Sequence, residues 1–105
     1  MKQQLAAFLL VSSLASATDW TGYISDAACG WNNARNTKGV KECARACVKA
    51  GWEPVFVPDG GMDAYKLADK GKQALPFVGE KVRITGTRKG DIVTIQKIRL
   101  APLRK

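Results

Sequence analysis

Two stretches of the chain alternate between hydrophobic and polar residues, which is the period of a half-buried β-strand. DWTGYISD, residues 19–26, is rich in aromatic and β-branched residues that favour strands. EKVRITGT, residues 80–87, alternates more cleanly and carries Gly86 within the predicted strand, where a strand can bend sharply. The turn RKGD follows, and IVTIQKIRL, residues 92–100, completes a predicted hairpin.

A helix is predicted over residues 40–50, where hydrophobic residues recur every three or four positions. Gly51 marks its end, since glycine commonly terminates helices. Cys47 falls nearest the middle of the hydrophobic stripe, and charged residues occupy the opposite side. The stripe consists of Val40, Cys43, Ala44, Cys47 and Val48.

Two shorter strands are predicted in the middle of the chain, at residues 53–57 and 64–69. Residues 70–79 form a linker with at most one helical turn, because Pro76 lacks a backbone donor. Five short strands favour a closed barrel, since closure removes exposed edges. We therefore predict a mainly β fold, a small five-stranded OB-like antiparallel barrel with one α-helix inserted after the first strand. An open sheet backed by the helix is the alternative.

The first 17 residues have the layout of a secretory signal peptide, with Lys2, an apolar run and a small-residue triplet that ends at Ala17. The apolar run is shorter than the ~20 residues that a membrane-spanning helix requires. We expect cleavage after Ala17, export to a periplasmic or extracellular location, and no transmembrane segment in the mature chain. Residues 18–105 would then form a single OB-like domain.

The chain of 105 residues is basic, with a formal net charge of +8. For an exported protein, cellular nucleic acid is not an expected partner. Anionic polymers of the cell envelope, or another exported protein, fit the expected location better. A basic surface that only keeps the protein soluble is the simpler interpretation and stays open.

Three cysteines, Cys29, Cys43 and Cys47, indicate one disulfide and one spare thiol. Cys43 and Cys47 are four residues apart on the predicted helix, which separates their Cβ atoms by ~5–6 Å, whereas a disulfide requires about 3.5–4.5 Å. Cys29 must therefore pair with one of them. We favour Cys29–Cys47, because the end of the helix should return to the end of the barrel near Cys29. Such a bridge stabilises the fold by roughly 3 kcal/mol. Cys43 is then a buried inert thiol or a link to a partner.

Catalysis and metal binding find little support in the residue types. The chain has no histidine, so the cysteines and Asp26 alone would have to supply a zinc site. The C-x-x-x-C spacing lies in mid-helix and differs from the C-x-x-C of oxidoreductases. We expect no enzymatic activity, no cofactor and no metal.

Binding is the function class that these residues favour. OB-type barrels bind extended polymers with aromatic platforms and basic residues. Trp31 lies in a polar loop and is the aromatic residue most expected at the surface, whereas the other two tryptophans, Trp20 and Trp52, are expected in the core. The candidate ligand-binding residues are Trp31, Tyr65, Arg83, Arg88 and Lys89, and the three cations are grouped near the last hairpin.

Four segments, TGYISDAACG, CARACVKAGWEPVFV, YKLAD and GEKVRITGTRKGDIVTIQKI, resemble a group of small exported bacterial proteins classed as a domain of unknown function. The motifs are a cysteine after the first strand, a C-x-x-x-C helix that ends in glycine, and a G-x-x-V-x-[VI]-x-G strand. The resemblance implies an OB-fold-like barrel and export, and no established activity. Related sequences carry histidines near the positions of Asn33 and Val40, so the resemblance implies no such metal site here.

The expected function is that of an exported binding or envelope-associated module of unknown ligand, stapled by a disulfide. The alternative is a structural or interaction protein that pairs with another chain through its spare cysteine. A cysteine-based metal-binding protein is a third, less favoured interpretation.

Overall fold

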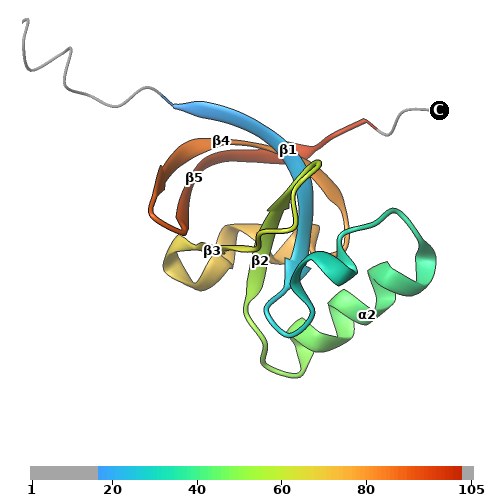
Figure 1. The fold of residues 1–105 in the computed structure, drawn as a ribbon. Coiled ribbons are helices and arrows are strands. Elements are labelled where there is room, and N and C mark those ends of the chain that lie inside the picture. Colours follow the sequence, from blue (N-terminus) through green and yellow to red (C-terminus); the bar gives the residue numbers. More distant parts are fainter. Residues whose placement is uncertain (1–16, 103–105) are drawn as a thin grey trace, which may run out of the picture.

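The computed structural model describes residues 17–102, which form a closed five-stranded barrel with one α-helix beside it (Figure 1). The predicted signal peptide lies, except for Ala17, outside these residues. The strand order around the barrel is β1-β2-β3-β5-β4. The elements in chain order, with η for a 3-10 helix, are β1 (Thr18–Asp26), η1 (Gly30–Asn33), α2 (Lys38–Lys49), β2 (Pro54–Pro58), β3 (Tyr65–Leu67), η2 (Ala68–Phe77), β4 (Lys81–Lys89) and β5 (Ile92–Leu100).

The predicted fold class is confirmed, because the protein is mainly β, its barrel is closed, and α2 is inserted between the first two strands. One strand pair differs from the antiparallel arrangement that we predicted. β3 runs parallel to β5, whereas the other four pairs are antiparallel. A parallel pair requires a long connection, and η2 together with β4 provides it.

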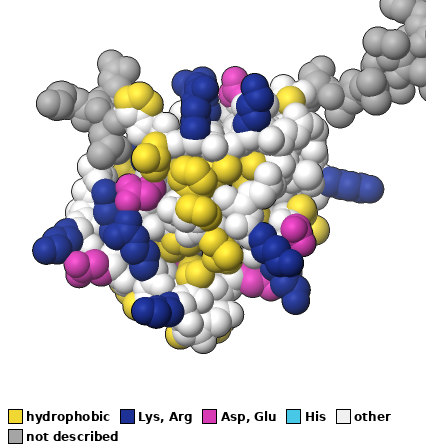
Figure 2. All heavy atoms as spheres, turned by 180° about the vertical axis from the view of Figure 1, so that it is seen from behind, with side chains coloured by type: hydrophobic (Ala, Val, Ile, Leu, Met, Phe, Trp, Pro, Cys, Tyr) yellow, Lys and Arg dark blue, Asp and Glu magenta, His cyan; other side chains and the backbone are white. Residues whose placement is uncertain are grey.

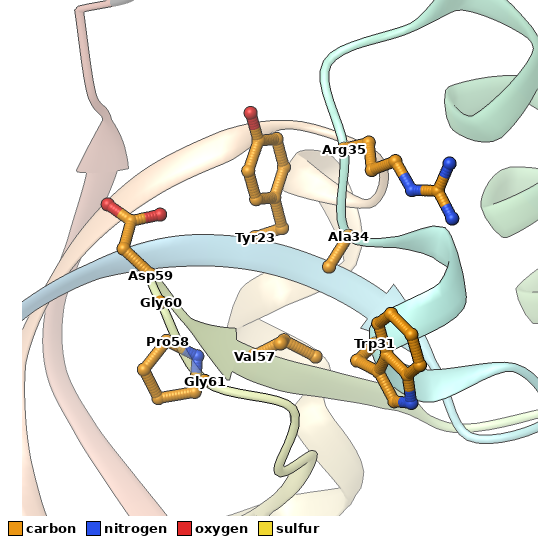
Figure 3. Close-up of a pocket in the computed structure, with 9 residues that line it drawn as sticks. All are labelled: Tyr23, Trp31, Ala34, Arg35, Val57, Pro58, Asp59, Gly60 and Gly61. Atoms are coloured by element: carbon orange, nitrogen blue, oxygen red, sulfur yellow. The ribbon is translucent and has the colours of Figure 1, made fainter.

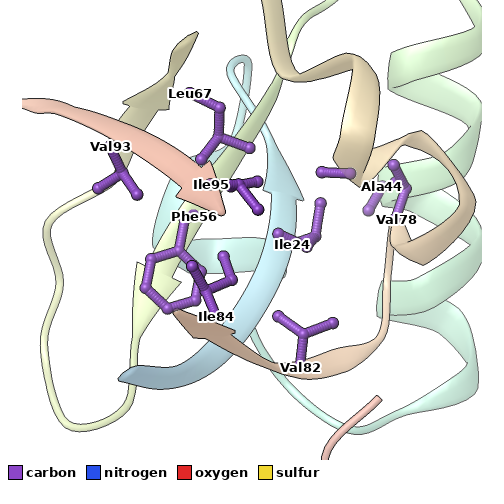
Figure 4. Packing of buried hydrophobic residues seen from close by; sticks show 10 residues of the cluster. Ile24, Ala44, Phe56, Leu67, Val78, Val82, Ile84, Val93 and Ile95 are labelled. Carbon is purple, nitrogen blue, oxygen red and sulfur yellow. The ribbon is translucent and has the colours of Figure 1, made fainter. Parts of the chain in front are cut away.

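The barrel interior is filled by inward-facing residues from all five strands (Figure 4). Phe56 is the largest fully buried side chain. The alternation predicted for residues 80–87 is confirmed, since Val82 and Ile84 are fully buried and Arg83 is exposed. Trp52 was wrongly expected in the core: its side chain is 53% exposed, because it lies in the connection after α2 rather than on a strand.

Helix α2 begins two residues earlier than predicted, because Thr37 caps its N-terminus and accepts from the backbone N–H of Val40 at 3.3 Å. Ala44 is fully buried, whereas Cys47 is half-buried. The centre of the buried stripe is therefore Ala44 and not Cys47, since a small side chain lets the helix approach the barrel closely. No helix within residues 17–102 has the length and hydrophobicity needed to cross a membrane.

The segment that we predicted as a linker is more regular than expected. η2 consists of two short helical pieces joined at a kink, where Asp69, Lys70 and Gly71 have left-handed φ angles. A Cβ atom on Gly71 would lie 2.6 Å from the ring of Pro54, so glycine allows this segment to cross the start of β2. Ala74 of η2 is fully buried, so the segment contributes to the core.

Candidate ligand-binding groove

The outward face of β1, β4 and β5 carries four cations, Lys81, Arg83, Lys97 and Arg99, which we call the cationic face. Side chains on the same side of neighbouring strands stand in rows, because each strand alternates its side chains between the two faces. The Lys81 ammonium also lies 5.9 Å from the ring centre of Tyr23. The rows are Tyr23–Lys81, Thr21–Arg83–Arg99 and Asp19–Thr85–Lys97.

A β-bulge in β5 brings two of these cations onto the face. The pairing of β4 with β5 shifts by one residue between Thr85 and Gly86, which leaves Gln96 as the extra residue on β5. One extra residue reverses the direction of every side chain beyond it. The bulge therefore turns Lys97 and Arg99 outward, and both are exposed.

Beside the cationic face, a pocket of about 230 Å³ opens between β1, β2 and the loop that contains η1 (Figure 3). Trp31, which is 44% exposed, and Tyr23 supply aromatic walls, and Val57 contributes an apolar surface. Figure 3 shows Tyr23 rising from β1 between the charged side chains of Asp59 and Arg35. The pocket thus combines two aromatic rings with one cation and one carboxylate.

Polar contacts beneath η1 hold Trp31 in position. Asp26 is fully buried, and its carboxylate accepts from the backbone N–H of Cys29 at 2.9 Å and from the side-chain amide of Asn33 at 2.8 Å. The Ser25 hydroxyl donates to the backbone carbonyl at the start of η1 at 2.6 Å. Such bonds from a side chain to its own loop fix the loop conformation. These hydrogen bonds therefore hold the loop that contains Trp31 against the end of β1.

Two further hollows continue from this pocket across the cationic face. The first, of about 380 Å³, shares Asp59 with the pocket and also contains Lys81. The second, of about 270 Å³, shares Arg83 with the first and includes Lys97 and Arg99. The three hollows are neighbours on one surface between η1 and β5, since each adjacent pair shares one lining residue, and we call them together the groove.

Two carboxylates neutralise part of the charge in the groove. Asp59 lies 3.1 Å from the ammonium of Lys81, and Asp19 lies 4.0 Å from the guanidinium of Arg83. Within residues 17–102, the other two members of the cationic face have no ion-pair partner. Exposed ion pairs contribute only ~0–1 kcal/mol to stability. Because the four cations of the cationic face outnumber these two carboxylates, the groove keeps a net positive charge and offers carboxylate acceptors beside its cations.

The structure separates the residues that the sequence grouped as binding candidates. Trp31 lines the pocket and Arg83 belongs to the cationic face, whereas Arg88 lies near the other end of β4. The Arg88 guanidinium is 4.7 Å from the ring centre of Tyr65, which packs against the core. This pair covers the barrel interior rather than facing the groove, and Lys89 is exposed beside the hairpin turn.

Sequence analysis missed Lys97 and Arg99, as well as Lys81 and Arg35, as candidate residues. The spacing of hydrophobic residues in β5 carried a signal for Lys97 and Arg99. Ile95 and Ile98 both pack toward the core although they are three positions apart. An odd spacing of core residues within a strand indicates a bulge. Arg35 had no such signal, since its place beside the pocket depends on how the loop after β1 folds back.

The three cysteines gather where the loop after β1 meets α2, and all three are free thiols. The predicted Cys29–Cys47 disulfide is not formed in this structure and stays a prediction for the oxidised protein. Cys43 was expected as a buried inert thiol if it had no partner, but it is exposed. Cys29 and Cys47 are half-buried.

The thiols influence one another and Asp26 influences them. Burial, the charge of Asp26 and the neighbouring Cys43 and Cys29 together raise the pKa of Cys47 to about 11. Burial raises the pKa of Cys29 as well, followed by the effects of Asp26 and Cys43. Metal binding requires thiolates, and within residues 17–102 no cluster of His, Cys, Asp or Glu has the geometry of a metal site.

No family model, no curated protein and no solved structure matches this chain in comparisons with known proteins. The OB-like description therefore rests on the closed barrel and its strand order. The resemblance to a group of exported bacterial proteins rests on the sequence motifs alone.

Proposed function

We propose that this protein is an exported, non-enzymatic binding module whose groove takes an extended, negatively charged polysaccharide of the cell envelope. The observation that carries the proposal is that the aromatic pocket and the hollows of the cationic face are neighbours, with Asp59 and Arg83 as the shared lining residues. An extended polymer can contact an aromatic wall and several separated cations at the same time. OB-type barrels commonly use this combination of groups.

The polar groups of the groove favour a polysaccharide over a nucleic acid. Asp59 and Asp19 lie among the cations, and the hydroxyls of Thr21 and Thr85 donate to them at 2.7 and 2.5 Å. Carboxylates accept hydrogen bonds from sugar hydroxyls, which a polysaccharide offers along its whole length and a DNA backbone does not. The cations can pair with acidic groups on the polymer, and the rings of the pocket can pack against a sugar ring.

Export forms part of the proposal and has a direct test. The first strand that the structure describes, β1, begins at Thr18, immediately after the predicted cleavage point, so cleavage there would remove no residue of this strand. We expect the mature protein to begin at Thr18. N-terminal sequencing of material secreted by a host with the general secretion pathway checks this result, and a secreted protein that retains Met1 would contradict it.

The proposed ligand class is tested with two substitutions on the cationic face. We expect the wild-type protein to bind polygalacturonate and not to bind neutral dextran. Its affinity for polygalacturonate should fall steeply as the salt concentration rises. K97Q/R99Q should weaken this binding roughly tenfold and reduce its salt dependence, because it removes two cations that have no ion-pair partner among residues 17–102. Isothermal titration at several salt concentrations measures both effects.

The control must separate the groove from net charge, because basic side chains are widely spread. Figure 2 shows Lys and Arg on both sides of a hydrophobic strip on the face seen from behind. K38Q/K49Q removes the same charge from exposed positions on α2. If the two double variants weakened polyuronate binding equally, the binding would depend on net charge alone. The groove would then be rejected as the binding site. Tighter binding to single-stranded DNA than to the polyuronate would reject the polysaccharide.

A matched pair of tryptophan variants provides a second arm of the same experiment. Trp31→Ala removes an aromatic wall of the pocket, whereas Trp52→Ala removes a tryptophan of similar exposure that lines a different hollow. Only the first substitution should weaken polyuronate binding, by roughly tenfold if a sugar ring stacks there.

A further inference from the structure

We infer that Cys43 is the first-reacting thiol of a disulfide relay, in which an oxidised thiol-exchange protein installs a bond that ends as Cys29–Cys47. The cluster of three thiols around the junction of the η1 loop and α2 carries this inference. The inference rests on one part of the proposed function, the location outside the cell, because that location supplies the oxidant. It does not depend on which ligand binds in the groove.

The exposures of the three thiols set the order of reaction. Cys43 is exposed on α2, so a disulfide on another molecule can reach its sulfur. Cys29 and Cys47 are half-buried and less accessible. Thiol–disulfide exchange requires the attacking sulfur to reach the disulfide. An incoming disulfide therefore meets Cys43 first.

The helix geometry selects the partner that resolves the first bond. Cys43 and Cys47 stand four residues apart within α2, a spacing that keeps Cβ atoms ~5–6 Å apart and disfavours a bond between them. Cys29 lies outside the helix, at the N-terminal boundary of η1, and its thiol interacts with both helix thiols. Cys29 is therefore the only one of the three cysteines that can bond to either helix thiol without distorting α2.

Each step of the relay balances in atoms and electrons. The Cys43 thiolate attacks the incoming disulfide, forms a mixed disulfide and releases one thiol of the oxidant. The Cys29 thiolate then attacks the Cys43 sulfur, forms Cys29–Cys43 and releases the second thiol. Finally the Cys47 thiolate attacks the Cys29 sulfur, forms Cys29–Cys47 and returns Cys43 as a thiol. The protein loses two electrons and two protons, and the oxidant gains them as two thiols.

The raised pKa of Cys47 agrees with its place at the end of this order. Burial, Asp26 and the neighbouring thiols raise the pKa of Cys47 to about 11, so few Cys47 thiolates exist at neutral pH. An attack by Cys47 is therefore expected last, once the other two sulfurs have reacted. The product leaves the exposed Cys43 free, where it can bond covalently to a second protein.

The test follows the reduced full chain as it reacts with oxidised glutathione at pH 8. Mass spectrometry of acid-quenched samples should show glutathione first on Cys43, then Cys29–Cys43, and finally Cys29–Cys47 with no glutathione retained. C43S should slow the first reaction about tenfold or more, because only half-buried thiols remain. C29S should retain glutathione on the protein, and C47S should stop at Cys29–Cys43.

The alternative outcomes each overturn part of the relay. A first glutathione adduct on Cys29 or Cys47 in the wild-type chain removes Cys43 as the first-reacting thiol, and this measurement needs no variant that must fold. Oxidation of C43S at the wild-type rate does the same. Formation of Cys43–Cys47 in C29S contradicts the helix geometry. A final wild-type product of Cys29–Cys43 rejects the last transfer, and none of these results bears on polyuronate binding.

Discussion

Gly86→Ala is expected to lower the free energy of unfolding by about 3 kcal/mol or more and to reduce Tm by roughly 12–24 °C. An ideal Cβ atom on Gly86 would lie 2.0 Å from the carbonyl oxygen of Thr94 and 3.1 Å from its carbonyl carbon. Both are backbone atoms of β5, so no change of rotamer relieves the overlap. The two strands would have to separate at the bulge, and thermal or urea unfolding measures the loss.

A second glycine provides the matched control for this experiment. Gly39 lies in α2, and a Cβ atom there would meet nothing within 4 Å. Gly39→Ala should therefore stabilise the protein by about 0.5–1 kcal/mol, because alanine favours the helix and restricts the unfolded chain. If Gly86→Ala were as stable as the wild-type protein, the close approach of β4 to β5 would be wrong. The placement of Lys97 and Arg99, which depends on the bulge, would then be wrong as well.

The parts of the fold that the sequence predicted are those set by local patterns. The alternation around Val82 and Ile84 survives in the structure, because one face of β4 meets the core and the other meets solvent. β1 departs from its alternation at its end, where Ser25 and Asp26 are both fully buried. The loop after β1 folds back over this end and bonds to both residues. A contact between distant surfaces of this kind leaves no periodic signal in the sequence.

The groove was predictable only in pieces. A polar loop made Trp31 a sound candidate for an exposed aromatic residue, and its exposure agrees with that expectation. The sequence grouped Arg83 with Arg88, and the structure places the two residues on the same strand in different surroundings. One contributes to the groove, and the other covers the ring of Tyr65. Composition and hairpin position indicate that cations are present, but strand register decides where each one points.

Asp26→Ala is expected to lower the free energy of unfolding by about 2–4 kcal/mol, because it leaves two donors without their acceptor. The donors are the side-chain amide of Asn33, which is buried, and the backbone N–H of Cys29. The loop that carries Trp31 should loosen with them. Urea unfolding gives the stability loss, and a red shift of tryptophan emission in the native state reports the loosened loop. Asp63→Ala, at an exposed position in the β2–β3 connection, should change neither quantity.

The same carboxylate links the fold to the thiol chemistry, and Asp26→Asn tests that link with less disruption. The amide oxygen can still accept one of the two hydrogen bonds, but the negative charge is gone. After burial, that charge is the largest cause of the raised pKa of Cys47, so its removal should lower this pKa from about 11. A lower pKa supplies more thiolate at pH 8, and the transfer from Cys29–Cys43 to Cys29–Cys47 should become faster. The pH dependence of alkylation at Cys47, followed by peptide mass spectrometry, measures the shift. An unchanged alkylation profile would mean that Asp26 only fastens the loop, and the thiol acidity would then derive from burial and the neighbouring sulfurs.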